Sequence, residues 1–216
     1  MEKDLSYLQD IRKEYIKASL HEENVAKDPI DQFSIWFTEA IHAKVMEPNA
    51  MTLATTSASG QANARTVLLK HVDEKGFVFF TNYTSKKGHE IAENNKIALL
   101  FFWPELERQV RILGTVEKTS YQESEEYFHS RPVGSQLGAL VSHQSSKIES
   151  RSVIEENLER LTMKFKDTEI PLPDYWGGYR STPHYLEFWQ GGANRLHDRI
   201  VYEKKDFSWD IYRVSP

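Results

Sequence analysis

Residues 51–88, MTLATTSASGQANARTVLLKHVDEKGFVFFTNYTSKKG, are the stretch of sequence that decides the fold class. Three segments within it, 51–55, 64–71 and 76–82, are rich in β-branched and aromatic residues, which favour extended strands. Ser59-Gly60 and residues 73–76 supply the turns between them. Strands that follow one another so closely leave no room for crossover helices, so the sequence predicts an antiparallel meander or barrel.

Strand signals continue on the C-terminal side of this stretch. They recur at 97–103, 108–118, 184–189, 195–202 and 209–214. Apolar residues at helical spacing predict a short insert at 85–94 and helices at 121–129 and 148–166. A loop rich in proline and aromatic residues is expected at 171–179.

Two further helices are expected before residue 51. Asp28-Pro29 is a good helix start, because Asp can cap the free N–H groups and Pro suits the first position, and Pro48 ends the pattern. Apolar residues from Leu5 to Ile16 recur at helical spacing and predict an N-terminal amphipathic helix. With no repeat or linker in sight, we expect one α+β domain over residues 1–216.

Composition bounds the class of protein. The chain of 216 residues is 39% hydrophobic and 12% aromatic, which argues against disorder. It has no cysteine, which excludes disulfides and thiolate chemistry, and its net charge of −5 disfavours a nucleic-acid partner. No apolar run approaches the roughly 20 residues of a membrane span, and residues 1–10 do not form a signal peptide. We therefore expect a soluble, cytoplasmic protein without a membrane partner. The histidine spacing shows no metal motif.

Two clusters of polar residues lie within the strand-rich stretch. In the first, Arg65 and Lys70 fall on opposite faces of a straight strand, so one flat site cannot use both unless the strand bends or lies between two ligands. A charged, solvated edge strand explains this cluster as well. In the second, Lys86 and Lys87 follow a helix start near Ser85, where free N–H groups can receive a phosphate. An ordinary N-cap followed by solvated lysines is the simpler interpretation of that segment alone.

Two more clusters lie nearer the C-terminus. Tyr127 and Arg131 share a helix face, and Ser135 stands near a new helix start after Pro132, a set that suits a phosphomonoester. A helix junction with a surface arginine is the competing interpretation. In the segment 189–199, Arg195, His197 and Arg199 share one face if the chain is extended, and they would repel one another unless an anion or a ring faced them. A hairpin with a solvated polar face remains the alternative there.

Together, five segments resemble the pyridoxamine 5′-phosphate oxidase family. They are RTVLLKHVDEKGFVFFTNYTSKKG (65–88), ERQVRILG (107–114), YFHSRPVGSQLGALVSHQSS (127–146), PLPDYWGGYR (171–180) and EFWQGGANRLHDR (187–199). The likeness runs from about residue 11 to residue 216, and WGGYR, FWQGG and RLHDR in this order are highly specific. The resemblance implies an antiparallel split β-barrel surrounded by helices, which forms a homodimer with FMN at the subunit interface.

The resemblance also implies which residues bind the ligands. FMN would contact Arg65, Thr66, Val67, Leu68, Leu69, Lys70, Phe80, Thr81, Lys86, Lys87, Gln109, Gln144, Ser145, Trp189 and Arg199. The substrate would contact Lys70, Tyr127, Arg131, Ser135, Arg195 and His197. An N-terminal helical segment of about residues 1–20 would cover the site and bring Arg12 and Tyr15 to it. No metal is implied.

The implied reaction is the oxidation of pyridoxamine or pyridoxine 5′-phosphate to pyridoxal 5′-phosphate. A hydride would pass from C4′ to flavin N5, and O2 would reoxidise the flavin to give H2O2, with NH3 released from the amine. Arg195 and His197 would be the catalytic residues. Lys86 stands where the family usually has arginine, so the cofactor phosphate loses a bidentate partner. A related flavin oxidase with another substrate, such as one from phenazine biosynthesis, and a non-catalytic binder of FMN or pyridoxal phosphate are the alternatives.

Overall fold

A computed structural model of the chain describes residues 14–216. These residues belong to two compact units, which we describe separately. Unit 1 comprises Met1–Pro48, Phe101–Arg111 and Tyr185–Pro216, and unit 2 comprises Asn49–Leu100 and Ile112–His184. The prediction of a single domain over the whole chain stays a prediction.

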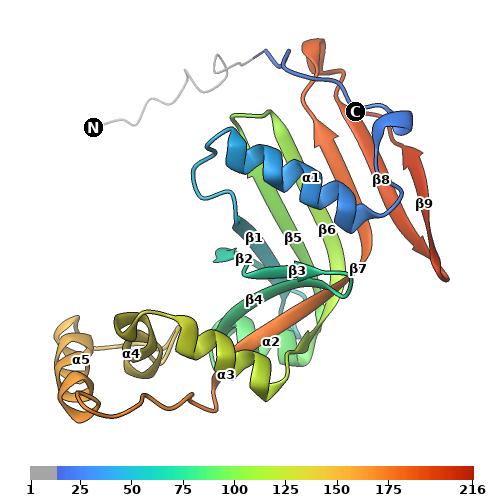
Figure 1. Ribbon diagram of the computed structural model, residues 1–216. Helices are drawn as coiled ribbons and strands as arrows, with labels where there is room; N and C mark the ends of the chain where they lie inside the picture. The colour runs from blue at the N-terminus through green and yellow to red at the C-terminus, as the bar shows by residue number, and fades with distance from the viewer. Residues whose placement is uncertain (1–13) are drawn as a thin grey trace, which may run out of the picture. The chain divides into compact units, whose positions relative to one another are not determined.

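Unit 2 is built on antiparallel strands (Figure 1). It holds β1 (Ala50–Thr56), β2 (Ala62–Leu68), β3 (His71–Asp73) and β4 (Gly76–Asn82), with segments of β5 (Lys96–Trp103), β6 (Arg108–Lys118) and β7 (Trp176–Gln190). The hydrogen-bonded order of these strands is β2-β1-β5-β6-β7-β4-β3. Gly76 begins β4 at φ +126°, and a Cβ there would lie 2.0 Å from the Ser181 carbonyl oxygen, so only glycine fits this turn.

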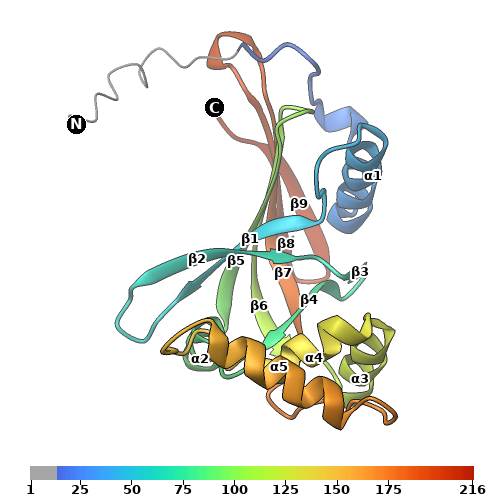
Figure 2. The same ribbon diagram turned by 90° about the vertical axis from the view of Figure 1, so that its left-hand side faces the viewer.

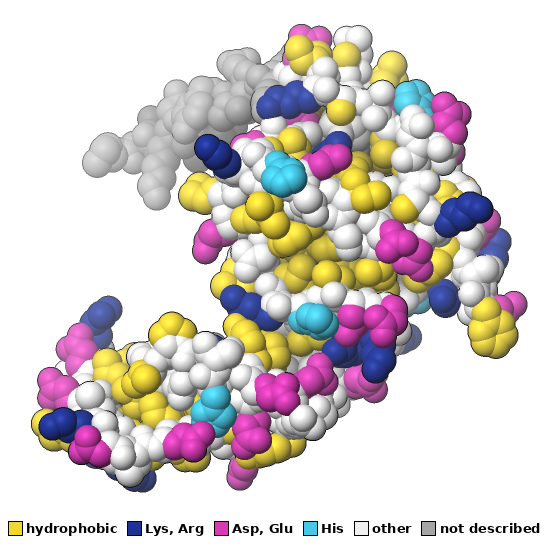
Figure 3. Space-filling model, in the orientation of Figure 1, with side chains coloured by type: hydrophobic (Ala, Val, Ile, Leu, Met, Phe, Trp, Pro, Cys, Tyr) yellow, Lys and Arg dark blue, Asp and Glu magenta, His cyan; other side chains and the backbone are white. Residues whose placement is uncertain are grey.

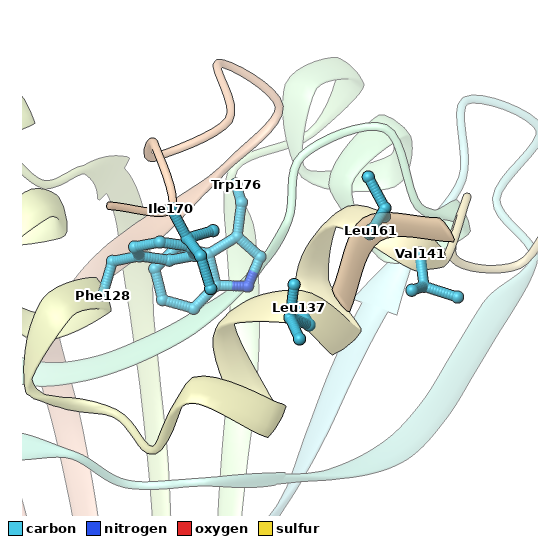
Figure 4. Packing of buried hydrophobic residues seen from close by; sticks show 6 residues of the cluster. All are labelled: Phe128, Leu137, Val141, Leu161, Ile170 and Trp176. Atoms are coloured by element: carbon cyan, nitrogen blue, oxygen red, sulfur yellow. The ribbon is translucent and has the colours of Figure 1, made fainter. Parts of the chain in front are cut away.

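Four helices complete unit 2. They are α2 (Lys86–Glu93), α3 (Tyr121–Ser130), α4 (Val133–Val141) and α5 (Ser152–Lys164), and α3, α4 and α5 lie side by side in Figures 1 and 2. The Ser85 and Ser120 side chains cap α2 and α3 by accepting hydrogen bonds from backbone N–H groups. Between these helices and β7 lies an apolar cluster of Phe128, Leu137, Val141, Leu161, Ile170 and Trp176 (Figure 4).

Unit 1 combines one helix with the C-terminal hairpin. Helix α1 (Pro29–His42) is capped by Asp28, and its Phe33 and Trp36 rings pack on Phe101 and Phe188. Strand β8 (Asp198–Lys205) pairs with β7 and with β9 (Ser208–Arg213), both antiparallel. Among the residues that the structure describes, short 3-10 turns lie before α1 at Glu22–Asn24 and between β7 and β8 at Ala193–Arg195.

The fold class predicted from the sequence is confirmed, and four element boundaries are corrected. The strand expected at 64–71 ends at Leu68, and the chain then pairs with β4 as β3. Strand β7 begins at Trp176, inside the expected loop, because its first residues pair with β4. The strand expected from Arg195 begins at Asp198 instead. Residues 14–16 are not helical, and the rest of the predicted N-terminal helix lies outside the described residues.

Candidate active site

A cavity of about 650 Å³ lies within unit 2. It is lined by Arg65, Thr66, Val67, Leu68, Lys70, Phe80, Thr81, Asn82, Lys87, Tyr127, Arg131, Pro132, Ser135, Gly138, Ala139, Ser142, Gln144 and Trp176. These residues come from β2, β4, α2, α3, α4 and the start of β7. On the face of the molecule in Figure 3, Lys and Arg side chains are interspersed with Asp and Glu.

The end of β2 brings Arg65 and Lys70 to the same cavity. Residues five apart point to opposite faces of a straight strand. Here β2 ends at Leu68, and the Lys70 N–H donates to the Val78 carbonyl 2.9 Å away, so the chain has changed its pairing partner. The sequence analysis allowed Arg65 and Lys70 to share one site only if the strand bends. The chain does bend, between Leu68 and Lys70.

A buried carboxylate holds Arg65 in place. Arg65 Nη2 lies 3.1 Å from Glu90 Oε2, and its Nη1 donates to Thr55 Oγ1 at 2.6 Å and to the Leu53 carbonyl at 3.1 Å. Glu90 also accepts from Thr55 and from Asn63. Burial by itself raises the pKa of the Glu90 carboxyl, but the Thr55 hydroxyl and the Arg65 guanidinium outweigh burial and lower it. Arg65 is thus a rigid, partly neutralised cation at the cavity wall.

Lys87 is a buried cation with neutral partners. Its Nζ donates to Gln144 Oε1 at 2.6 Å and to Thr81 Oγ1 at 3.1 Å. No carboxylate of residues 14–216 lies within ion-pair distance of it. Burial, with a smaller contribution from the charge of Arg65, lowers the pKa of Lys87 to about 8. An anion bound in the cavity would relieve this cost.

Arg131 presents a guanidinium that is only partly satisfied by the protein. Its Nη2 donates to the Ser135 carbonyl at 2.7 Å, while Nη1 is buried and, among the described residues, has no hydrogen-bond partner. Its Cζ lies 4.7 Å from the centre of the Trp176 ring. Burial lowers the pKa of Arg131. Buried donors are normally paired, so the free Nη1 points to an anionic ligand.

A second hollow of about 470 Å³ lies beside the start of α2. Lys86, Gln144, Ser145 and Ser146 contribute to it, together with Thr84 before the helix. Ser145 has a positive φ of 72°, so the loop after α4 is bent sharply at this point. Basic side chains beside a helix N-terminus suit a phosphate group.

In unit 1, an aromatic cluster surrounds His197. The Trp189 and His197 rings lie 4.6 Å apart, and the Tyr15 ring lies 5.7 Å from Trp189 and 5.8 Å from His197. The Gly192 N–H donates to His197 Nδ1 at 3.1 Å, so the neutral ring carries its proton on Nε2. Burial and the charge of Arg195 lower the pKa of His197. Arg195 itself is exposed, with a φ of 64°.

Arg199, in contrast to Arg195, is held by a carboxylate. Its Nε donates to Glu187 Oε1 at 2.8 Å, and Glu187 also pairs with Arg111. Glu187 is only 2% exposed. Burial raises the pKa of its carboxyl, but the hydrogen bond from Arg199 and the charges of both arginines outweigh burial and lower it.

The structure thus brings together many of the residues that the resemblance implies. Twelve of them line the cavity of unit 2: Arg65, Thr66, Val67, Leu68, Lys70, Phe80, Thr81, Lys87, Tyr127, Arg131, Ser135 and Gln144. Lys86 and Ser145 lie in the neighbouring hollow, whereas Leu69 is buried in the core. Gln109, Trp189, Arg195, His197, Arg199 and Tyr15 belong to unit 1, and Arg12 lies outside the described residues.

One sequence argument about these residues is wrong in its geometry. Arg195, His197 and Arg199 do not share one face of an extended segment, because Arg195 ends a 3-10 turn with positive φ and only Arg199 lies in β8. The two glycines before the turn allow this path, since a Cβ at Gly192 would lie 2.3 Å from the Leu196 carbonyl oxygen.

Sequence reasoning missed several residues of these sites, among them Trp176, Glu90 and Glu187. Trp176 lies in a segment expected to be a loop, although its place in the WGGYR motif could have identified it as a site residue. Glu90 and Glu187 resembled ordinary surface acids, and only tertiary contacts reveal that both are buried beside arginines.

Family models match two parts of the chain. Residues 37–165 match the model described as "Pyridoxamine 5'-phosphate oxidase". The chain belongs to the pyridoxamine 5′-phosphate oxidase family. Residues 176–216 match the model described as "Pyridoxine 5'-phosphate oxidase C-terminal dimerisation region", and this match covers all of β7 and the β8–β9 hairpin.

Curated relatives in the family are similar over nearly their whole length. The protein of Cyanothece sp. named pyridoxine/pyridoxamine 5′-phosphate oxidase is 52% identical to this chain, over 97% of this chain and 98% of the relative. The protein of that name in Trichormus variabilis is 54% identical, over 96% of this chain and 97% of the relative. Family membership therefore rests on the whole chain and not on a few motifs.

Solved structures support the fold. PhzG from Burkholderia lata 383, in complex with tetrahydrophenazine-1-carboxylic acid, is 29% identical, with a TM-score of 0.86 over 91% of this chain and 98% of that one. A pyridoxamine 5′-phosphate oxidase-related, FMN-binding protein from Nostoc punctiforme shares 14% identity with a TM-score of 0.68, over 85% and 97% of the two chains. The latter likeness shows the fold alone.

The described residues contain neither a metal-binding group nor a membrane-spanning helix. Within residues 14–216, no group of three or more His, Asp or Glu side chains could hold a metal ion. No helix in this part of the chain is long and apolar enough to cross a membrane.

Proposed function

We propose that this protein is an FMN-dependent oxidase that converts pyridoxamine and pyridoxine 5′-phosphates to pyridoxal 5′-phosphate with O2 as acceptor. The observation that carries the proposal is the buried Nη1 of Arg131, which has no partner within residues 14–216, in a cavity that Lys70, Tyr127 and Ser135 also line. A guanidinium, an ammonium and two hydroxyl groups form a donor set suited to a phosphate monoester. Relatives about half identical carry the name of this oxidase.

The residues of unit 2 also fit FMN. The cavity holds the cations Arg65 and Lys87, and Lys86 stands at the start of α2 in the neighbouring hollow. Together they can neutralise a phosphate dianion and the negative charge of a reduced ring. When bound, FMN would accept a hydride from the substrate and return the electrons to O2.

The protein's own part in the reaction is positioning and electrostatics. Arg131, Tyr127, Ser135 and Lys70 would hold the substrate by its phosphate, which fixes the ring at a set distance from that anchor. Arg195 is exposed and would stabilise negative charge on the substrate ring, and His197, protonated on Nε2, would donate a hydrogen bond to its phenolic oxygen.

We further propose that two copies of the chain assemble, with FMN at their interface. The match of residues 176–216 to a dimerisation region supports the homodimer. Trp189, Arg195, His197 and Arg199 all lie in that region and would complete the site.

A visible spectrum of the purified protein, followed by anaerobic addition of pyridoxamine 5′-phosphate, tests the proposal. We expect a flavin spectrum that bleaches with substrate and recovers in air, with release of peroxide. Bound flavin that bleaches with neither vitamer phosphate would contradict the substrate assignment, and a protein that takes up no FMN would contradict the cofactor.

One observation favours a second candidate substrate. The PhzG structure, with its TM-score of 0.86, binds a phenazine carboxylic acid. Oxidation of a reduced phenazine acid, without activity on either B6 phosphate, would favour this alternative. The donor set around Arg131 argues for a phosphate ester instead.

A further inference from the structure

Arg131 is positioned by an aromatic ring instead of a carboxylate. Its Cζ lies 4.7 Å from the centre of the Trp176 ring and 5.8 Å from that of Phe128. Within residues 14–216, no Asp or Glu forms an ion pair with it, and its one described hydrogen bond goes to the Ser135 carbonyl. The guanidinium is therefore oriented by two uncharged groups.

Two other arginines of unit 2, the buried Arg180 and the half-buried Arg65, show the alternative arrangement. Arg180 pairs with both Asp73 and Glu123, and Arg65 pairs with Glu90. A carboxylate fixes an arginine but also neutralises it, so an incoming anion must compete for the same N–H groups. The face of an indole ring attracts a cation without offering a competing anion. Arg131 can thus be fixed in place while its buried Nη1 has no hydrogen-bond partner among the described residues.

The Trp176 ring is itself held firmly. It stacks on Phe80, at 5.5 Å between ring centres and 16° between planes, and lies nearly parallel to Tyr127 at 7°. Phe128 packs edge-on against it at 5.3 Å, within the cluster shown in Figure 4. Because it is packed on several sides and only 8% exposed, the ring gives Arg131 a rigid platform.

We infer that Trp176 is a positioning residue that selects phosphorylated ligands, because it holds the Arg131 guanidinium toward the cavity with its charge free. The inference rests on the proposed function, since it assigns the Arg131 end of the cavity to a substrate phosphate. It adds a residue of β7 to a phosphate site otherwise formed by Lys70, which follows β2, and by residues of α3, α4 and the link between these two helices.

Equilibrium binding tests the inference without any need for turnover. Dissociation constants for pyridoxal 5′-phosphate, unphosphorylated pyridoxal and FMN would be measured with wild type, Trp176→Leu and Trp176→Phe. We expect Trp176→Leu to bind the phosphate ester about ten-fold more weakly, since desolvated cation–π contacts have this size. Trp176→Phe should recover most of the loss, and the constants for pyridoxal and FMN should stay within about two-fold.

Leu161→Ala is the matched structural control. Leu161 belongs to the same apolar cluster as Trp176 but does not line the cavity. It should lower the thermal midpoint and leave the phosphate-ester constant unchanged. If Leu161→Ala weakens binding as much as Trp176→Leu does, the effect of Trp176 is merely structural and the inference is wrong.

A double-mutant cycle identifies the group through which Trp176 acts. In an Arg131→Ala background, Trp176→Leu should cause no further loss of affinity for the phosphate ester. An equal ten-fold loss in that background would overturn the inference, as would a Trp176→Leu variant with the wild-type constant. Wild-type protein that binds the ester as described but oxidises neither vitamer would refute the proposed function and leave the inference standing. Wild type without preference for the phosphorylated ligand would refute both.

Discussion

Two cations of the unit 2 cavity, Arg131 and Lys87, differ from the paired arginines of the C-terminal segment in unit 1, whereas Arg65 in the same cavity is paired with Glu90. In the cavity, Arg131 and Lys87 have uncharged partners among the described residues, and one donor of Arg131 is buried without any. In unit 1, Arg199 is paired with the buried Glu187, and Arg213 is paired with Glu22 and Asp198.

This difference distinguishes cations that are available to bind an anionic ligand from cations that form structural ion pairs. A buried charge without a counter-charge is costly, so an arrangement of that kind indicates a ligand. An arginine tied to a buried carboxylate is satisfied in the absence of a ligand. Arg195 is the exception in unit 1, because it is exposed and ends a turn with positive φ.

The largest expected effect is the loss of activity when Arg195 is replaced. We expect Arg195→Leu to bind FMN as the wild type does but to lose about a hundred-fold or more in kcat/KM, as when one donor to a developing charge is removed. Steady-state peroxide production would be compared with FMN affinity. Arg151→Leu, which removes an exposed arginine of an i,i+4 surface pair, is the control and should retain wild-type rates. A wild-type kcat/KM in Arg195→Leu would remove Arg195 from catalysis.

The next effect tests the free cation of the cavity. Arg131→Ala should raise KM for pyridoxamine 5′-phosphate by about ten- to a hundred-fold, because charge-assisted hydrogen bonds to the phosphate are lost. Arg160→Ala removes an exposed arginine of α5 and should leave KM unchanged. An unaltered KM in Arg131→Ala would mean that this cation does not bind the substrate phosphate.

A stability measurement tests the paired cations. Glu187→Gln should lower the free energy of unfolding by about 3 kcal/mol, because Arg111 and Arg199 would face each other without their shared carboxylate. Urea unfolding at pH 7 gives this value. Glu155→Gln, in an exposed pair with Arg151, should change it by less than about 0.5 kcal/mol.

The same carboxylate gives the pH dependence a definite sign. The pKa of Glu187 is lowered in the folded protein, so its contribution is fully present above the unfolded pKa of about 4.5. It is lost as the pH falls through the lower folded value. The difference in stability between wild type and Glu187→Gln should therefore shrink on acidification. A difference that stays constant down to pH 3 would contradict this assignment.

The smallest expected effect is a pH dependence of cofactor binding. Lys87 has a pKa of about 8 in the free protein, so it is charged below that pH and becomes neutral above it. If the charged form binds FMN, affinity should fall several-fold between pH 7 and pH 9.5, as followed by flavin fluorescence. Lys87→Arg stays charged throughout, so its affinity should be flatter over this range. Equal slopes in both proteins would exclude Lys87 as the titrating group.

The sequence predicted most of the architecture because local chemistry controls it. Ser85 and Asp28 cap helices as expected, and the strands 51–55 and 76–82 lie within β1 and β4. Pro132 stands at a junction where a second helix, α4, begins, as its geometry suggested. These features depend on residues a few positions apart, and such contacts can be read from a sequence.

The errors concern pairing across the chain. The Pro, Gly and aromatic residues around the start of β7 are turn-like in isolation and predict a loop, yet pairing with β4 makes Trp176 a strand residue. The prediction of an extended segment through Arg195 is wrong, because two glycines allow a tight turn that period-2 alternation does not reveal. Tertiary pairing overrode local propensity at β7, whereas a local turn interrupted the expected strand before β8.

The sequence by itself determined the strand-rich fold class, the residue types that bind anions and membership of the family. Tertiary structure alone decided which cations are free. Arg65 and Arg131 are chemically identical in sequence, but Glu90 neutralises the first and Trp176 supports the second. Glu90 lies 25 residues from Arg65 and Trp176 lies 45 residues from Arg131. Only folding brings such residues within a few ångströms, the distance over which a charge is neutralised or left for a ligand.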